Sequence, residues 1–296
     1  MALPYVLTLI ADRAHGPLNP AVVRTARDML GGAAPIELSP GEAVDIPCPS
    51  PGPGAPGAAA LRAAFAPHRV DAIFQRVRGR RKAVLIADMD STIVANETLD
   101  DLAALAGCGE AVAAITQASM NGEIEFEDAL RQRVALLKGR PATLLKRAWS
   151  ETRINPDART VVQTMRRHNA RTALVSGGFT WFTARVAEAC GFDEHHGNAL
   201  TLSGDTLAGT LHAEILGPDA KRLHLERLAE ERGVKLSATC AIGDGANDIP
   251  MLTMAGLGLA FHGKPRVRAV VERQINFTGL RTVLFAQGYP AASFVE

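Results

Sequence analysis

Residues 83–92 read AVLIADMDST, and this stretch decides the fold class. Its first half, residues 83–87, is an uninterrupted apolar run, which is typical of a central strand in a parallel sheet covered on both faces. The runs TALV (172–175) and TCAI (239–242) have the same character. Three such strands separated by long, helix-rich segments predict an α/β fold built on a parallel sheet.

Each of these apolar runs ends in polar residues, namely DMDST, SGGFT and GDGAND. In open parallel sheets the ligand crevice lies beyond the carboxyl ends of the strands, so we expect these three segments to converge. Asp88 and Asp90 alone would fit a polar strand end that caps a helix. Together with Asp244 and Asp248, however, they predict a hard cation such as Mg²⁺, which offsets the repulsion between carboxylates.

Two further features suit a phosphate group. Ser176, Gly177 and Gly178 follow the second strand and combine a hydroxyl with two residues that let backbone N–H groups approach a phosphate closely. Lys221 opens a strongly helical stretch and could reach back into the crevice. Taken singly, the first feature is a common turn and the second a solvated lysine.

The segments 88–92 and 176–179, Lys221 and the segment 243–248 resemble, in this order, the four motifs of haloacid-dehalogenase-superfamily phosphatases. The resemblance extends over most of residues 83–285, where it is strongest to members that hydrolyse O-phospho-L-serine. It implies a Rossmann-like doubly wound parallel sheet (the HAD core) with a mostly helical cap insert. The activity it implies is Mg²⁺-dependent hydrolysis of that phosphomonoester through an aspartyl phosphate, the last step of L-serine biosynthesis.

The resemblance also implies a role for each motif residue. Asp88 would be the nucleophile and Asp90 the general acid and base. Mg²⁺ would be held by the Asp88 carboxylate, the Asp90 main-chain carbonyl and Asp244. The remaining motif residues would bind the substrate or support the metal ligands: Ser176, Gly177, Gly178 and Lys221 on the phosphoryl oxygens, Asn247 beside the substrate, and Asp248 behind the metal.

The cap is expected at about residues 97–153, between the first and second strands. Phosphoserine carries an ammonium group, which suits a carboxylate such as Glu97, and a carboxylate, which suits a bidentate arginine such as Arg133. The resemblance points to those two residues. It also places Met120 and Phe126 over the substrate, although plain core packing explains a Met or Phe on a helix equally well.

The first 77 residues form a different pattern. Strands are predicted at 4–11, 35–38, 43–46 and 70–77, with helices at 19–30 and 58–66, so the order is βαββαβ. This order defines a ferredoxin-like α+β module similar to regulatory ACT domains. We expect a domain boundary at RGRRK (78–82), read as a solvated connection, followed by a phosphatase domain over 78–296. The hypothesis for the module is dimerisation or serine sensing.

Composition excludes several classes of protein. Thirty-two basic and 31 acidic residues give a net charge of +1, so we expect no nucleic-acid partner. No apolar run reaches about 18 residues, so we expect no membrane span. The apolar run at 3–11 lacks the basic flank of a secretory signal, and the expected location is cytoplasmic. His195 and His196 have no carboxylates at ligand spacing, so a surface turn without metal ligation is predicted.

Three alternatives to this function remain. One is a ligand-sensing protein in which the N-terminal module binds an amino acid and the phosphatase domain is secondary. Another superfamily phosphatase or phosphotransferase, acting on phosphohomoserine or a similar phosphomonoester, would share the same motifs, because they fix phosphoryl chemistry and not the leaving group. A signalling receiver domain also uses an aspartyl phosphate and Mg²⁺, but it needs only about 120 residues and has no use for the hydrolytic Asp90. The expected partner is a small-molecule substrate, and a homodimer is left open.

Overall fold

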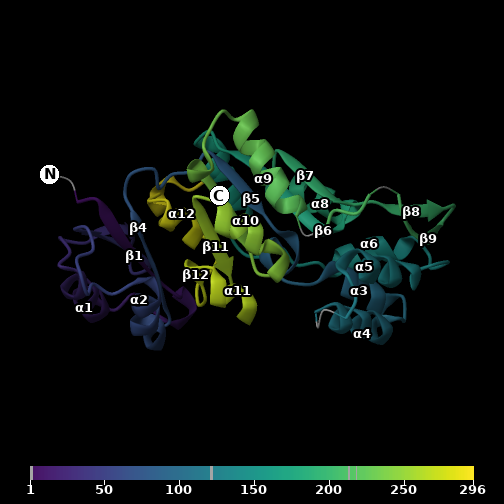
Figure 1. Cartoon of the computed structure of the whole chain (residues 1–296), viewed down its shortest axis with the longest axis horizontal. Helices are drawn as coiled ribbons and strands as arrows, with labels where there is room; N and C mark the ends of the chain where they lie inside the picture. The colour runs from purple at the N-terminus through teal and green to yellow at the C-terminus, as the bar shows by residue number, and fades with distance from the viewer. Residues whose placement is uncertain (1–2, 121–122, 213, 218) are drawn as a thin grey trace. The chain divides into compact units, whose positions relative to one another are not determined.

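The computed structural model describes residues 3–120, 123–212, 214–217 and 219–296, and Figure 1 labels its helices and strands. The chain divides into two compact units. Unit 1 comprises Met1–Ile86, Pro156–Thr172 and Leu225–Glu296, and unit 2 comprises Ala87–Asn155 and Ala173–His224. In the described ranges, no helix is both long and apolar enough to cross a membrane.

The N-terminal part of unit 1 contains a four-stranded antiparallel sheet with strand order β2-β3-β1-β4. Along the chain, its strands and helices follow one another in the order that the sequence predicts. The order βαββαβ is confirmed, and with this strand order it makes a ferredoxin-like module. Its elements are β1 (Tyr5–Ala11), α1 (Pro20–Leu30), β2 (Ile36–Ser39), β3 (Ala43–Cys48), α2 (Ala58–Phe65) and β4 (Val70–Arg76).

Local sequence explains where α1 begins and ends. The Asn19 side chain accepts a hydrogen bond from the Ala21 N–H, and Pro20 occupies the first turn, where its missing N–H is not needed. Gly31 ends the helix in the left-handed conformation at φ 58°, which favours glycine. Val22 and Ala26 face the module's core, where they pack with β-sheet residues such as Leu7 and Ile46.

The main sheet has six strands in the order β12-β11-β10-β5-β6-β7. Within unit 1, β11 (Leu257–Phe261) pairs in parallel with β10 (Thr239–Gly243) on one side and β12 (Gln274–Ile275) on the other. Every residue of β10 and β5 (Val84–Ala87) is buried, as their uninterrupted apolar runs predict. The residues of β11, a strand that was not predicted, are buried as well. The predicted Rossmann-like parallel sheet is therefore confirmed. The other helices of unit 1 are α7 (Ala158–Arg167), α10 (Ile249–Met254), α11 (Pro265–Val270) and α12 (Thr282–Ala286).

In unit 2, β6 (Arg171–Phe179) is longer than the predicted run at 172–175, because the strand continues through Ser176, Gly177 and Gly178. It pairs in parallel with β7 (Glu194–Asn198), and the register shifts between Val175 and Phe179. The remaining elements of the unit follow in chain order: α3 (Thr98–Leu105), α4 (Gly109–Met120), α5 (Phe126–Ala135), α6 (Thr143–Glu151), α8 (Thr180–Cys190), the hairpin β8 (Leu200–Ser203) and β9 (Thr206–Leu211), and the first residues of α9 (Ala220–Glu231), which belongs to unit 1 from Leu225 onward.

The segment 78–82 is only in part the solvated connection that its charge predicts, because Arg78, Gly79 and Arg81 are exposed whereas Arg80 and Lys82 are not. The Arg80 side chain is only 11% exposed, and its guanidinium lies 2.5 Å from an oxygen of Asp45 in β3. The Lys82 ammonium is part-buried and donates to the main-chain carbonyls of Gly79 and Ser237. The sequence of a charged run does not show which groups its side chains bind. Here the partners include Asp45 and the Ser237 carbonyl, which lie in distant parts of unit 1.

Candidate active site

Asp88 lies at the carboxyl end of β5 and heads a short kinked segment, Met89–Ile93. One carboxylate oxygen, Oδ1, accepts the Met89 N–H at 2.7 Å and lies 2.6 Å from the Lys221 Nζ. The Asp88 and Lys221 side chains are 8% and 4% exposed, so water screens this ion pair very little. The structure thus brings together two residues that are far apart in the sequence and that were predicted from separate motifs.

Asp90 follows Asp88 by two residues, and other groups bind its carboxylate. Its Oδ1 accepts the Thr98 N–H at 2.8 Å, and its Oδ2 accepts the Ser176 hydroxyl at 3.3 Å. Burial, together with the negative charge of Glu97, raises the pKa of Asp90 to about 6 despite these hydrogen bonds. A carboxyl group with this pKa exchanges a proton readily near neutral pH, which is what a general acid and base requires.

The backbone directly after Asp90 is bent at Ser91, which adopts φ 54°, an uncommon conformation for a residue with a side chain. The Ser91 hydroxyl donates to an oxygen of Glu97 at 2.8 Å, and its N–H donates to the Asn96 carbonyl. These two bonds hold the bend, so local strain at this point is stabilised by the first residues of the following segment.

The glycines of the second motif are required by close packing. A Cβ atom on Gly178 would lie 2.9 Å from the Asp90 Oδ2 and 3.1 Å from the Ser176 Oγ. The Gly178 N–H donates to that same hydroxyl oxygen at 2.8 Å. On Gly177, a Cβ would lie 3.2 Å from the Phe126 ring, which places the ring of this predicted substrate-contacting residue directly over the motif.

Asn198 was not found by sequence reasoning, although it fixes this motif. The side chain is buried at the end of β7, where it donates to the Gly177 carbonyl at 2.8 Å and accepts the Leu216 N–H at 2.8 Å. It therefore joins the end of β6 to the segment that leads into α9 and Lys221. A single asparagine between a strand and a loop carries no motif that would have identified it.

The predicted cap residues take distinct positions in unit 2. Glu97 is exposed and precedes α3. Arg133 is partly buried in α5, where it donates to the Thr116 hydroxyl and the Ala129 carbonyl. Burial lowers the pKa of Arg133, while the charges of Asp100 and Glu97 act in the opposite direction. Met120 ends α4, and its side chain lies outside the described residues.

Unit 1 carries the fourth motif at the carboxyl end of β10. Asp244 is buried, and its Oδ2 lies 3.1 Å from the Nζ of Lys264, a residue that sequence reasoning missed. Asp248 is fully buried and accepts the N–H groups of Asp244 and Gly245. Asp248 therefore shapes the loop that presents Asp244, and Gly243 has no room for a side chain because Asp248 lies against it.

Asp88 in unit 2, and Asp244 and Asp248 in unit 1, each offer a carboxylate, the hard oxygen donor that could hold a metal ion. Oxygen ligands suit Mg²⁺ better than they suit softer transition metals. Asp244 also has a lysine beside it, which partly offsets its charge when no cation is bound. The donor chemistry therefore fits the predicted Mg²⁺.

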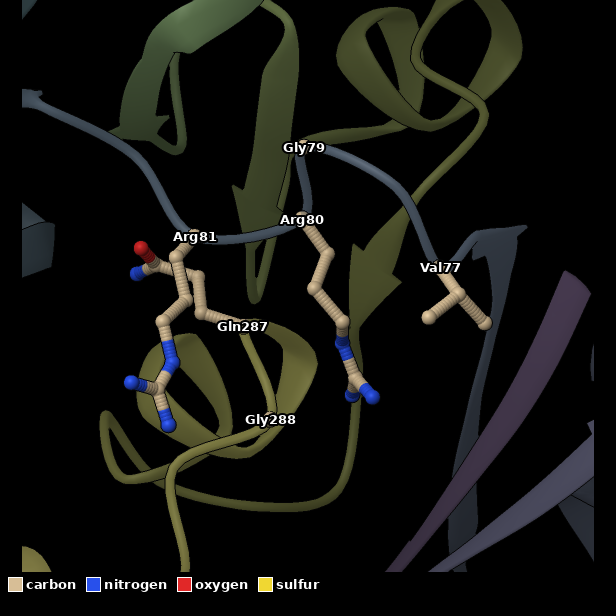
Figure 2. A pocket seen from close by; sticks show the side chains of 6 residues that line it. All are labelled: Val77, Gly79, Arg80, Arg81, Gln287 and Gly288. Carbon is tan, nitrogen blue, oxygen red and sulfur yellow. The ribbon is translucent and has the colours of Figure 1, made fainter. Parts of the chain in front are cut away.

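One pocket in unit 1 lies apart from all of these residues. It has a volume of about 280 Å³ and is lined by Val77, Gly79, Arg80, Arg81, Gln287 and Gly288 (Figure 2). Arg80 in its wall already donates to Asp45, Thr8 and two main-chain carbonyls, and the Arg81 guanidinium lies 4.4 Å from the centre of the Tyr289 ring. None of the predicted site residues lines it.

Known proteins resemble the chain along the part that carries these motifs. The family model of haloacid dehalogenase-like hydrolases matches residues 85–253. A phosphoserine phosphatase of Streptomyces coelicolor is 42% identical over 209 residues, which cover 71% of this chain and 51% of that protein. The chain thus spans about half the length of this relative. A phosphoserine phosphatase of Lactococcus lactis is 39% identical over 203 residues, which cover 69% of this chain and 94% of that protein.

Among solved structures, a probable phosphoserine phosphatase of Vibrio cholerae in its unliganded form superimposes with a TM-score of 0.79 at 28% identity. The similarity covers 98% of this chain and 88% of that one. The family match spans more than half of the chain and includes all four motifs. The chain therefore belongs to the haloacid dehalogenase-like hydrolases.

Proposed function

We propose that the protein hydrolyses O-phospho-L-serine to L-serine and phosphate in a Mg²⁺-dependent reaction. The observation that carries the proposal is the buried Asp88–Lys221 ion pair beside Asp90, whose pKa is raised to about 6. This arrangement combines a fixed carboxylate nucleophile with an acid that can give and regain a proton. The names of the relatives from Streptomyces and Lactococcus support the choice of substrate.

Asp88 acts as the nucleophile. One of its carboxylate oxygens attacks phosphorus in line and forms an aspartyl phosphate, while the bond between phosphorus and the seryl oxygen breaks. The contacts of Asp88 Oδ1 with the Met89 N–H and the Lys221 ammonium fix the orientation of the carboxylate before substrate arrives. Such fixed positioning avoids reorganisation during the reaction.

Asp90 moves the proton in both halves of the reaction. In its protonated form it gives a proton to the departing seryl oxygen. As a carboxylate it then takes one from the water that attacks the aspartyl phosphate, so the group returns to its starting state. Before substrate binds, the Ser176 hydroxyl and the Thr98 N–H hold the two carboxyl oxygens in place.

The phosphoryl group is held by Ser176, the backbone of Gly177 and Gly178, and Lys221. Positioning and charge stabilisation by such donors account for most of the catalysis in phosphoryl transfer. Mg²⁺ would be held by the Asp88 carboxylate, the Asp90 carbonyl and Asp244, with Asp248 and Asn247 supporting them. When bound, the ion offsets the negative charge of the phosphoryl oxygens.

Glu97 and Arg133 select the amino-acid part of the substrate. In this proposal Glu97 pairs with the ammonium group and Arg133 with the carboxylate, because these are the two charges that phosphoserine carries beyond its phosphate. Phe126 packs over the substrate. The close approach of the Phe126 ring to Gly177 supports that position for Phe126.

The test is phosphate release from L-phosphoserine, phosphohomoserine, phosphoethanolamine and p-nitrophenyl phosphate, each with Mg²⁺ and with EDTA. We expect Mg²⁺-dependent turnover with a strong preference for phosphoserine. Preference for phosphohomoserine would keep the chemistry and change the substrate. Equal activity on phosphoethanolamine, which lacks the carboxylate, would contradict the role of Arg133, and activity in EDTA equal to that in Mg²⁺ would contradict the metal.

We also propose that residues 1–77 act as a separate module, either as a homodimer contact or as a sensor of serine. The support is the module's own four-stranded sheet and hydrophobic core. Sedimentation of the full chain with and without L-serine tests both roles. A monomer whose activity and mass do not respond to serine would contradict them. The cytoplasmic location stays a prediction.

A further inference from the structure

Unit 2 gathers three potential metal ligands outside the catalytic motifs. Glu194 and His196 lie two residues apart on β7, so their side chains leave the same face of the strand. His224 comes from α9, one turn after Lys221. The ligand atoms of Glu194, His196 and His224 all lie within 4.8 Å of one another. The structure thus contradicts the surface turn predicted for His195 and His196.

The three side chains are already in contact. The His196 Nε2 lies 3.0 Å from an oxygen of Glu194, and the rings of His196 and His224 stack with their centres 4.0 Å apart. All three residues are partly exposed, so an ion from solvent can reach them. His195 is different, because its Nδ1 bonds the Thr183 hydroxyl at 3.0 Å.

Two imidazoles and one carboxylate form a ligand set typical of Zn²⁺. Mg²⁺ prefers an all-oxygen set, so this cluster differs in chemistry from the carboxylates near Asp88. Ligands of a tetrahedral Zn²⁺ lie about 3.3 Å apart, given Zn–N bonds of about 2.0–2.1 Å. Side-chain rotations that move the ligand atoms by about 1 Å would therefore bring them to the distances that a tetrahedral ion requires.

We propose that Glu194, His196 and His224 form a second metal site, selective for Zn²⁺ or a similar transition-metal ion, with a water in the fourth position. An ion bound there would tie α9 to β7. Because α9 also carries Lys221, whose Nζ lies 2.6 Å from Asp88, the ion would restrain the helix end that positions this lysine.

Co²⁺ is a suitable probe, because a tetrahedral site with nitrogen ligands gives intense visible absorption whereas an octahedral oxygen site gives little. The untagged full chain is titrated with Co²⁺ in excess Mg²⁺, and Zn²⁺ is then added. We expect one tetrahedral Co²⁺ per chain, displaced by Zn²⁺. His196→Ala, His224→Ala and Glu194→Gln should each weaken Co²⁺ binding at least about tenfold, the usual effect of losing a ligand or its partner.

His195→Ala is the matched control, because it removes a neighbouring imidazole and leaves the cluster intact. It should bind Co²⁺ as the unaltered chain does. Asp244→Asn should also keep the tetrahedral signal, which separates this site from the carboxylates. In addition, Zn²⁺ should raise the melting temperature of the unaltered chain and not that of His224→Ala.

Two results would overturn the proposal. One is the absence of a tetrahedral signal in the unaltered chain. The other is equal loss of the signal in His195→Ala and His224→Ala, which would indicate a nonspecific effect. If His224→Ala were to lose its fold, Glu194→Gln would decide the outcome, because this change keeps the size of the side chain and removes only its charge.

Discussion

Asp88 and Lys221 hold opposite charges in a place that water hardly reaches. Replacing Asp88 by Asn keeps the shape and removes the nucleophile, so we expect kcat for phosphoserine to fall by at least about 10³-fold. The lysine loses its buried partner, and breaking such a pair costs about 3–5 kcal/mol of unfolding free energy. A steady-state assay with circular dichroism measures both effects.

The control for this variant is Asp219→Asn, an isosteric change at a carboxylate that is 73% exposed beside the start of α9. It should leave both turnover and the unfolding free energy unchanged within error. Turnover by Asp88→Asn within tenfold of the unaltered chain would show that Asp88 is not the nucleophile.

Asp90 gives a pH dependence of stability. Its pKa is raised from 3.8 to about 6 in the folded protein, so between these values the folded state binds more protons than the unfolded state. Stability therefore falls as the pH rises through this window. Asp90→Asn cannot ionise and keeps an oxygen for the Thr98 N–H, so it should be more stable than the unaltered chain above about pH 6, by about 1–3 kcal/mol.

Urea unfolding of both proteins at pH 4.5 and pH 7.5 in EDTA measures this difference, and the assay should show that Asp90→Asn has lost turnover. A stability difference that stays the same at both pH values would contradict the raised pKa. Gain of stability with loss of activity is the expected signature of a functional group kept in an unfavourable environment.

At the scale of elements, the close packing at the end of β6 requires glycine at position 178. We expect Gly178→Ala to lower kcat/KM by about 10- to 100-fold, because its methyl group would displace the carboxylate of Asp90 or the hydroxyl of Ser176, and misplacement by about 1 Å has effects of this size. Gly57→Ala is the control, since its Cβ meets nothing within 4 Å. Equal kinetics in the two variants would contradict the packing argument.

The elements also show what sequence patterns can predict. Strands β5 and β10 were predicted because they are apolar along their whole length and buried on both faces. Strand β7 was missed because its sequence, EHHGN, is polar and only partly buried, and β12 because it has two residues. Both strands form because they pair with a neighbouring strand, and the local sequence pattern does not reveal this pairing.

The site likewise contains residues that the sequence predicted and residues that it did not. Asp88, Ser176, Lys221 and Asp244 belong to motifs, so sequence alone predicted that they act together. Asn198 and Lys264 were missed because they act through contacts with residues far away in the sequence. Such partners follow from the fold and are visible only once the fold is known.

At the scale of the whole molecule, unit 1 joins the N-terminal module to the C-terminal part of the chain through buried polar contacts. Arg80 bonds Asp45 of the module and the carbonyls of Phe285 and Ala286. Asp71 in β4 accepts four hydrogen bonds, from the N–H groups of Asn276, Phe277 and Thr278 and from the Thr278 hydroxyl. The module is thus bonded to the segment that follows β12.

Asp71→Ala tests this connection. Removing the carboxylate leaves the N–H groups of Asn276, Phe277 and Thr278 without this acceptor in a partly buried loop. Each unsatisfied buried group costs about 1–3 kcal/mol, so we expect a loss of at least about 3 kcal/mol of unfolding free energy. Asp28→Ala, at an exposed carboxylate of α1, should change it by less than about 0.5 kcal/mol. Urea unfolding measures both. Because Asp71 lies outside the catalytic motifs, turnover by the folded variant at 25 °C should stay within about twofold. Equal stabilities of the two variants would mean that the module and the C-terminal segment are not energetically coupled through Asp71, and that the boundary near residue 78 separates two independently folding parts.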